Sequence, residues 1–213
     1  MLILVLSSCN TDKTKKNVSV QGQIDNLGQT VIVVSYFDAG QIRCFDTIMS
    51  NNKGIFDFDI LVNENPTPIS IQFVEQKKWT TLFGAPGDKI NIKGDINYVD
   101  LLSIRGGDVN NDLEKFKNSI HQLYKERLDL ISDFDYASKT DLTRLIEINL
   151  LLKQKAKEYI LDHTNALASV VLIQDFFYHD FDPITIELID LLKGEAANSN
   201  MANQIRTGAN KRN

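Results

Sequence analysis

The chain has 213 residues, of which 43% are hydrophobic and 24% are charged, with only 4 Pro and 11 Gly. This composition excludes a collagen-like, low-complexity or wholly disordered protein, and the length allows one large or two small domains with a hydrophobic core. Residues 1–16 and 194–213 each carry +2 within a net charge of −5, so the remaining body carries −9 and lacks the clustered basic residues that bind nucleic acid.

The first sixteen residues have the pattern of an export signal. An apolar run over residues 1–6 leads into two serines and Cys9, after which the sequence turns polar and basic up to Lys16. Leu6-Ser7-Ser8-Cys9 resembles the lipobox of bacterial lipoproteins, which implies that Cys9 receives a lipid and that residues 1–16 are signal and tether. Because no basic residue precedes the run, we expect the true start to lie upstream. The alternative is a short hydrophobic terminus packed on the domain.

Short, often alternating segments typical of β-strands fill residues 17–107 and predict an antiparallel β-sandwich of seven or eight strands. The predicted strands are residues 18–24, 30–36, 45–48, 55–60, 69–73, 80–83 and 89–93. Turn residues separate them: Asn51-Asn52-Lys53-Gly54 predicts a hairpin, and Ala85-Pro86-Gly87-Asp88 predicts a type II turn.

The predicted strand at 55–60 contains two aspartates. Asp57 and Asp59 alternate with Phe56, Phe58 and Ile60. Because successive side chains of a strand point to opposite faces, the aspartates belong to one face and the apolar residues to the other. We therefore interpret them as the solvated face of a half-buried strand rather than as a paired-carboxylate site.

Cys44 is the only thiol that remains if Cys9 is lipidated, and it lies in the strand-like segment 41–47. The sequence has no Cys-x-x-Cys motif, and no histidine lies near Cys44 to activate it. We interpret Cys44 as a small buried hydrophobe, with a free thiol as the alternative. Disulfide exchange by this chain alone is not expected.

From about residue 108 the period becomes helical, so residues 108–193 predict a C-terminal helical bundle and the fold class is α+β. Asn111 and Glu114 have the spacing of a capping box at the start of the first helix. Further helices are expected at 139–161, at 165–177 as the buried one, and at 183–193, with Asp182 as cap and Gly194 as stop. Residues 194–213 predict a polar tail with little to bury.

The order of these features resembles the N-terminal half of Bacteroidetes lipoproteins of the thiol-disulfide oxidoreductase group, a module known as domain of unknown function 4369. The matching segments are 20–24 (VQGQI), 46–48 (DTI), 54–58 (GIFDF), 83–94 (FGAPGDKINIKG), 104–107 (IRGG), 111–112 (ND), 159–160 (YI) and 165–169 (NALAS). In full-length relatives a thioredoxin-like domain with Cys-x-x-Cys follows the helices. The resemblance implies the accessory module alone, with residues 194–213 as a candidate linker to the missing domain.

No catalytic, cofactor or metal-binding residue is predicted. His121, His163 and His179 do not have the spacing that places two metal ligands on one helical face. The segment 178–182 (YHDFD) is the best metal-like cluster, but a loop in which Asp182 caps a helix explains it with one carboxylate. Residues 84–89 lack the spacing of a phosphate-binding loop and are interpreted as a turn.

We therefore expect a non-catalytic lipoprotein that the lipid on Cys9 holds at the bacterial cell envelope, facing the periplasm or at the outer membrane. No other stretch approaches the roughly 20 apolar residues of a membrane span. The expected role is to bind or position a partner in envelope thiol-disulfide chemistry, such as a protein with a thioredoxin-like fold. The alternatives are a truncated or split oxidoreductase, and a small-ligand receptor with an apolar pocket in the seam between sheet and helices.

Overall fold

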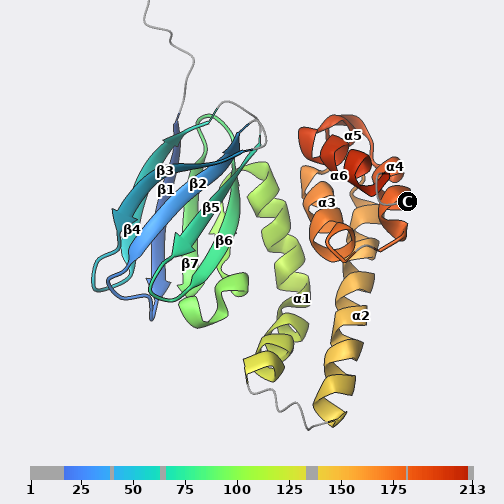
Figure 1. The fold of residues 1–213 in the computed structure, drawn as a ribbon, viewed down its shortest axis with the longest axis horizontal. Helices are drawn as coiled ribbons and strands as arrows, with labels where there is room; N and C mark the ends of the chain where they lie inside the picture. Colours follow the sequence, from blue (N-terminus) through green and yellow to red (C-terminus); the bar gives the residue numbers. More distant parts are fainter. Residues whose placement is uncertain (1–16, 39–40, 63–65, 133–138, 181, 211–213) are drawn as a thin grey trace, which may run out of the picture.

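The computed structural model describes residues 17–38, 41–62, 66–132, 139–180 and 182–210, and these form a mixed α/β fold. The strands are β1 (Asn17–Asp25), β2 (Val31–Asp38), β3 (Gln41–Met49), β4 (Ile55–Leu61), β5 (Thr67–Phe73), β6 (Lys78–Gly84), β7 (Lys89–Asp95) and β8 (Ser103–Arg105). The helices are η1 (Ile96–Leu101), α1 (Asp108–Ser132), α2 (Lys139–Asp162), α3 (Leu167–Ile173), η2 (Gln174–Tyr178), α4 (Ile184–Leu191), α5 (Gly194–Asn198) and α6 (Asn200–Asn210). The strands gather on one side of the molecule and the helices on the other (Figure 1).

The strands form two four-stranded sheets, in the orders β4-β1-β7-β8 and β3-β2-β5-β6. Within the described residues five of the six strand pairs are antiparallel, but β1 and β7 run parallel, with Ser19 opposite Lys89. The expected all-antiparallel arrangement is therefore wrong at this pair. The chain passes through the other sheet before it returns as β7, so no hairpin fixes the direction in which β7 enters beside β1.

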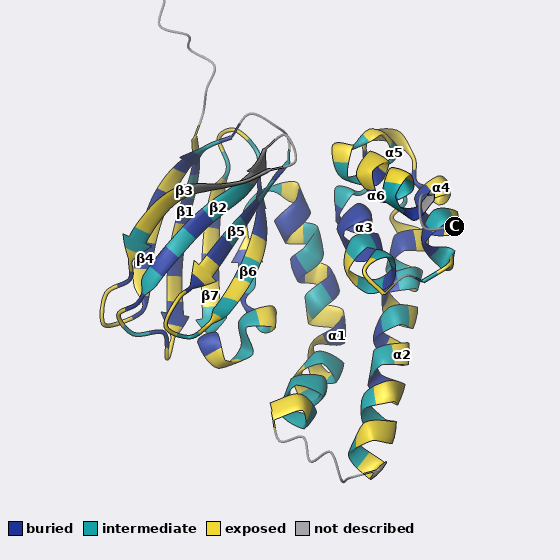
Figure 2. Cartoon of the chain, viewed as in Figure 1, coloured by how far each residue is buried: buried dark blue, intermediate teal, exposed yellow. Residues whose placement is uncertain are grey.

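The two sheets share one hydrophobic core, to which strands of both contribute. Alternation explains how each strand reaches it, since Phe56, Phe58 and Ile60 of β4 are buried while Asp57 and Asp59 are exposed. The same alternation of buried and exposed residues is visible along the strands in Figure 2. The interpretation of the two aspartates as a solvated face is confirmed.

The turns lie where the sequence places them, but their roles differ. Residues 51–54 form a tight turn in which Gly54 donates to the carbonyl of Asn51 at 2.9 Å, yet β3 and β4 on either side belong to different sheets, so the expected hairpin is wrong. Residues 85–88 also connect the two sheets. There Asp88 donates to the carbonyl of Ala85 at 3.0 Å and Gly87 has a φ of 96°, as a type II turn requires at its third position.

The first long helix starts earlier than expected, at Asp108, so the predicted capping box is wrong. Asn111 accepts instead from the backbone N–H of Gly106 at 3.0 Å. Glu114 turns toward β8, where it accepts from the hydroxyl of Ser103 at 2.6 Å and from the backbone N–H of Ile104 at 3.3 Å. The Gly106 backbone has a φ of 113°, which favours glycine and makes the sharp turn from β8 into α1.

The later helices lie close to their predicted positions. Helix α2 covers the predicted span, and α3 is the buried helix, because all six residues from Ala168 to Ile173 are buried. The α-helical backbone changes to a π-helical turn at η2, which the sequence did not indicate. Asp182 accepts from the backbone N–H of Ile184 at 3.2 Å at the start of α4, as expected for a cap. Helix α4 ends at Leu191, before the expected stop, and Gly194, with a φ of 55°, is instead the first residue of α5.

The expectation that residues 194–213 form a polar tail with little to bury is wrong for residues 194–210. Helices α5 and α6 pack on α3 and α4, and Ala196, Ala202 and Ile205 are buried in the same core as α2 and α3. Small apolar residues at helical spacing supply a narrow buried face, which the polar composition conceals. The last three residues lie outside the described part of the chain.

The β part and the helical part have separate cores, which a small third cluster connects. Phe83 of β6, Val109 of α1 and Val171 of α3 are its buried members. Helix α1 belongs to both parts, since Lys117 donates to the carbonyl of Leu102 at 3.0 Å while Phe116 packs into the helical core. Among the described helices, none has a stretch long and apolar enough to span a bilayer.

Candidate ligand-binding cleft

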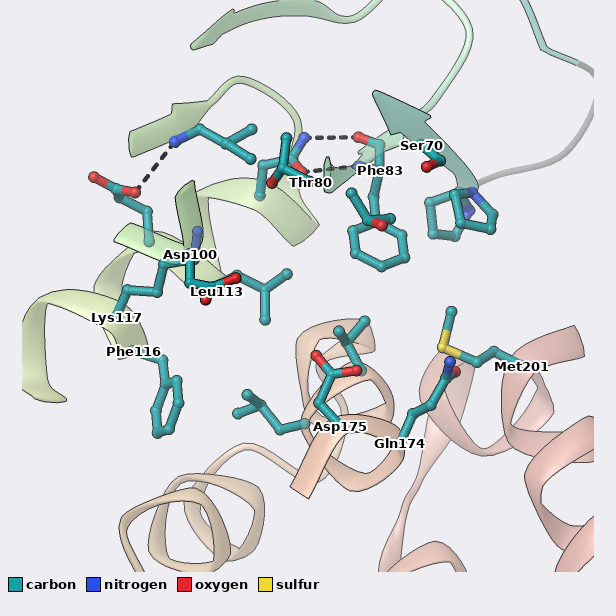
Figure 3. A pocket seen from close by; sticks show the side chains of 18 of the residues that line it. Ser70, Thr80, Phe83, Asp100, Leu113, Phe116, Lys117, Gln174, Asp175 and Met201 are labelled. Atoms are coloured by element: carbon teal, nitrogen blue, oxygen red, sulfur yellow. Dashed lines mark hydrogen bonds between the residues drawn. The ribbon is translucent and has the colours of Figure 1, made fainter. Parts of the chain in front are cut away.

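A cleft of about 940 Å³ lies at the seam between the β part and the helical part. One wall is the outer face and free edge of the sheet β3-β2-β5-β6, and the other comes from α1, α3, η2 and α6 (Figure 3). The volume is in the range of sites that hold small ligands. Its walls include Tyr36, Pro68, Ser70, Trp79, Thr80, Thr81, Phe83, Asp100, Ile104, Asn110, Leu113, Glu114, Phe116, Lys117, Tyr124, Val171, Gln174, Asp175 and Met201.

The β wall combines aromatic rings with hydroxyl groups. Strand register places Ser70 opposite Thr81 and Pro68 opposite Phe83 on the outer face of the sheet. Trp79, the only tryptophan of the chain, lies two residues before Thr81 on the same strand and is 66% exposed. The exposed indole is suited to hold an apolar body and to donate a hydrogen bond through its N–H, while the neighbouring hydroxyl groups can donate or accept.

The upper end of the cleft is fixed by Asn110 of α1, which is only 3% exposed. Its amide oxygen accepts from the backbone N–H of Phe83 at 2.9 Å, and its amide nitrogen donates to the carbonyl oxygen of Phe83 at 2.7 Å. The same nitrogen also donates to the carbonyl oxygen of Gly106 at 2.7 Å. Asn110 therefore joins β6, the β8–α1 turn and α1 with one side chain.

The helical wall presents Gln174 and Asp175 from the π-helical turn η2. Figure 3 shows both side chains pointing from this turn into the cleft, toward the side on which Phe83 lies. A π-helical turn widens the helix by one residue and is common at functional sites, because it reorients side chains that an α-helix would turn elsewhere. Met201 of α6 and Val171 of α3 supply the apolar surface around them.

Asp175 is the most perturbed acidic group of the cleft. Water reaches its side chain, but the protein walls around it reduce the solvation of the carboxylate and raise its pKa to about 6. The positive charges of His179 and Lys117 act in the opposite direction. Within the described residues, no hydrogen bond or ion pair is formed by the Asp175 carboxylate. It is therefore a charged group that faces the cleft without a partner.

Two further groups of the cleft have shifted pKa values. Burial lowers the pKa of Lys117, and the nearby carboxylates of Glu114, Asp100 and Asp175 oppose that shift. Burial also raises the pKa of Tyr124. Glu114 is already satisfied by Ser103 and Ile104 and lies 3.5 Å from Arg105, so we assign it to the structure rather than to ligand binding.

A second cleft of about 260 Å³ adjoins the first and shares Phe83, Val171 and Met201 with it. Its other lining residues are mainly apolar and come from α1, α3 and the start of α6. The two spaces together make a site with a polar, charged end near Asp175 and an apolar end near Met201.

The residues singled out from the sequence lie elsewhere. Cys9 lies outside the described residues, and Cys44 lies in β3 with its side chain outside the described part. The ring of His163 stacks on Tyr159 with 4.1 Å between centroids, and His179 contacts Gln174. Within the described residues, no group of three or more metal-ligating side chains comes together.

The segment 178–182 is a helix cap, as interpreted from the sequence. Lys153 of α2 lies 2.9 Å from the Asp180 carboxylate and 3.2 Å from the Asp182 carboxylate, so both acids have a cationic partner. Asp182 also caps α4 through the N–H of Ile184. These bonds account for both carboxylates.

From the sequence, a pocket in the seam is only an alternative, and no residue is predicted to line it. Asp175 lies in the predicted helix 165–177, where apolar neighbours on both sides are typical of a buried helix. A lone acid within that apolar run was the signal that could have found it, because an acidic residue interrupts the apolar face there. Comparison with protein family models, with curated proteins and with solved structures finds no match.

Proposed function

We propose that this protein is a binding protein whose ligand occupies the cleft between the sheet β3-β2-β5-β6 and the helices. The unpartnered Asp175 carboxylate in a cleft of about 940 Å³ carries the proposal. A carboxylate in a partly desolvated site favours a ligand with a cationic group, and the rings of Tyr36, Trp79 and Phe116 favour an apolar body attached to it. The proposed role is to bind or position that ligand.

We also propose the β-sandwich, the helical bundle and the cell-envelope location that the sequence predicts. The two sheets are proposed to act as a β-sandwich and the helices as a bundle, with the cleft at their seam. The lipid on Cys9 and the resemblance to the accessory module of envelope lipoproteins are part of the same proposal. They would place the cleft in the cell envelope.

Small amines test the proposal directly. Phenethylamine has a cation and an aromatic body, and 2-phenylethanol is its neutral counterpart. We expect saturable binding of the amine, seen by saturation-transfer NMR and by a change in Trp79 fluorescence, and weaker binding of the alcohol. Asp175→Asn should lower the affinity for the amine by roughly fivefold or more and leave the alcohol unchanged. Glu187→Gln, which removes an exposed carboxylate of α4, is the control.

A second test fills the cleft with a bulky side chain. Ser70 and Gln72 lie on the same face of β5, but only Ser70 lines the cleft. Ser70→Phe should abolish binding of both probes, and Gln72→Phe should retain it. Equal binding to wild type and Ser70→Phe, or no saturable binding to wild type, would refute the proposed function.

A further inference from the structure

The cleft runs along an edge strand in which only some backbone N–H and C=O groups form hydrogen bonds. In the sheet order β3-β2-β5-β6, β6 is an edge and pairs with β5 alone. In an antiparallel pair, the N–H and C=O groups of alternate residues point toward the partner and away from it. The N–H and C=O of Phe83 form hydrogen bonds with the side chain of Asn110, so both groups point away from β5.

The same alternation places the backbone groups of Thr81 and Trp79 on this free edge. Both residues line the cleft, and within the described residues no hydrogen bond is formed by their free-edge N–H and C=O groups. The two positions are adjacent rungs, about 7 Å apart along the strand. They form a short unpaired strand edge inside the cleft.

Both ends of this edge are closed. Asn110 fills the rung at Phe83 with one acceptor and one donor, which is the pair of bonds that a neighbouring strand would make. At the other end, Lys78 donates to the carbonyl oxygens of Ile96 and Asn97, at 2.9 Å each, and so ties the start of β6 to η1. The free edge is confined to the rungs that open into the cleft, and natural proteins rarely leave such rungs uncovered.

We propose that the occupant of the cleft is an extended polypeptide segment with basic side chains, which adds to β6 as a further strand and pairs a lysine or arginine with Asp175. This inference rests on the proposed function, because it names the class of ligand for the same cleft. Main-chain hydrogen bonds to Thr81 and Trp79 supply affinity, and side-chain pockets supply selectivity, as in other cases of strand addition.

The charges of the cleft determine the sign of the charge that a bound segment should carry. Asp100, Glu114 and Asp175 line it against the single cation Lys117 among the described lining residues, and Glu114 is already paired with Arg105. The chain body also carries a charge of −9 over residues 17–193. Such a field attracts basic segments and repels acidic ones.

Strand geometry determines the spacing of the basic residues. Alternate side chains of an added strand point to the outer face of the sheet, toward η2 and Asp175, and the others point to the gap between β6 and β8. Thr80 of β6, Ile104 of β8 and Leu113 of α1 also line the cleft, and they suit small or branched apolar side chains. The predicted ligand pattern is therefore basic and apolar residues in alternation.

The test uses a capped seven-residue peptide of alternating valine and lysine. Its first control is the same peptide with its three central amides N-methylated, which keeps the side chains and removes the donors. Its second control replaces lysine by glutamate. Trp79 fluorescence and isothermal calorimetry measure affinity for the full chain. We expect the lysine peptide to bind at least tenfold more tightly than either control.

Variants of β6 test the role of the backbone. Thr81→Pro removes the N–H of a free rung, and proline is tolerated at edge-strand positions whose N–H faces away from the sheet. Thr81→Val keeps the N–H and has a similar shape. We expect Thr81→Pro to weaken peptide binding by about fivefold and Thr81→Val to bind like wild type. Circular dichroism verifies that both variants are folded.

Phenethylamine separates the two proposals. If the amine binds and the lysine peptide does not, or if the N-methylated peptide and Thr81→Pro bind as well as their parents, the strand addition is refuted and the binding cleft stands. If neither amine nor peptide binds, both proposals fail. Weaker peptide binding by Thr81→Pro than by Thr81→Val, with equal amine binding by the two variants, supports the inference.

Discussion

At the scale of single residues, Asn110 connects the two parts of the molecule. Its amide makes three hydrogen bonds to backbone groups of β6 and of the turn before α1, and the residue is buried. A buried side-chain amide contributes most to the free energy of unfolding where its loss leaves several backbone groups unpaired. Within the described part of the chain, these are the hydrogen bonds that join α1 to the end of β6.

We predict that Asn110→Ala destabilises the protein by about 3 kcal/mol, because Phe83 loses partners for both its N–H and its C=O while buried. The neighbouring Asn111→Ala is the control and should cost less than about 1 kcal/mol, since Asn111 makes one exposed bond to Gly106. Urea denaturation followed by circular dichroism measures both. Similar losses for the two variants would contradict the role assigned to Asn110.

Asp175 makes stability depend on pH. Its pKa in the folded chain is about 6, above its ordinary value of 3.8, so between these values the folded state binds more protons than the unfolded state. Stability therefore falls as the pH rises through this window. We predict that Asp175→Asn is more stable than wild type by about 1 kcal/mol at pH 7.5, a value reduced because water reaches the carboxylate.

The difference between Asp175→Asn and wild type should shrink to a small fraction near pH 4, where the carboxyl is protonated in the folded state and about half protonated in the unfolded state. Urea denaturation at pH 4 and at pH 7.5 measures it. Glu187→Gln serves as the control, since Glu187 is exposed on α4. An equal difference at both pH values would show that Asp175 is not the titrating group.

At the scale of elements, α6 contributes to the helical core despite its polar composition. Ile205 is 2% exposed and lies in one cluster with Ala202 and with residues of α2 and α3. Met201, at the start of the same helix, lines the cleft. Met201 lies one turn before Ile205 on the same face and also packs against that core, so the packing of α6 holds this wall of the site in place.

We predict that Ile205→Ala destabilises the protein by about 3 kcal/mol, the usual cost of removing a large buried aliphatic side chain. Thr207→Ala, at an exposed position of the same helix, should change stability by less than about 0.5 kcal/mol. Thermal unfolding followed at 222 nm compares the two. A neutral Ile205→Ala would indicate that α6 does not pack on the core in solution.

At the scale of the whole molecule, α1 couples two cores that otherwise meet only in a small cluster. It bonds to β6, β8 and the end of η1 through Asn110, Glu114 and Lys117, and it packs Phe116 and Ile120 into the helical core. Unfolding of either core removes the support of α1 for the other. The two parts should therefore unfold together.

Trp79 reports on the β part, while the signal at 222 nm comes mainly from the helices. We predict that the urea transitions seen by tryptophan fluorescence and by circular dichroism coincide in wild type. In Phe83→Ala, which removes the largest buried member of the connecting cluster, the transitions should separate. Two separate transitions in wild type would show that the parts are independent domains.

The sequence predicted well those features that depend on local period. Seven strands, the span of α2 and the burial of α3 follow from alternation and helical spacing. The three-residue β8 was missed because it is too short for a period, and α6 was missed because its buried face consists mostly of alanine. The cleft was only an alternative, because Asp175, Trp79 and Thr81 come together through packing between parts distant in the chain.

The parallel pairing of β1 with β7 affects the order in which the chain can fold during its synthesis. During synthesis β1 leaves the ribosome first, yet Ser19 meets its partner Lys89 only after another 70 residues have been added. Until then β1 has β4 on one side and an open edge on the other. Such distant pairing slows folding and leaves one edge of β1 open until β7 has been made, so this half of the sheet is exposed to wrong pairing for longer than the helices.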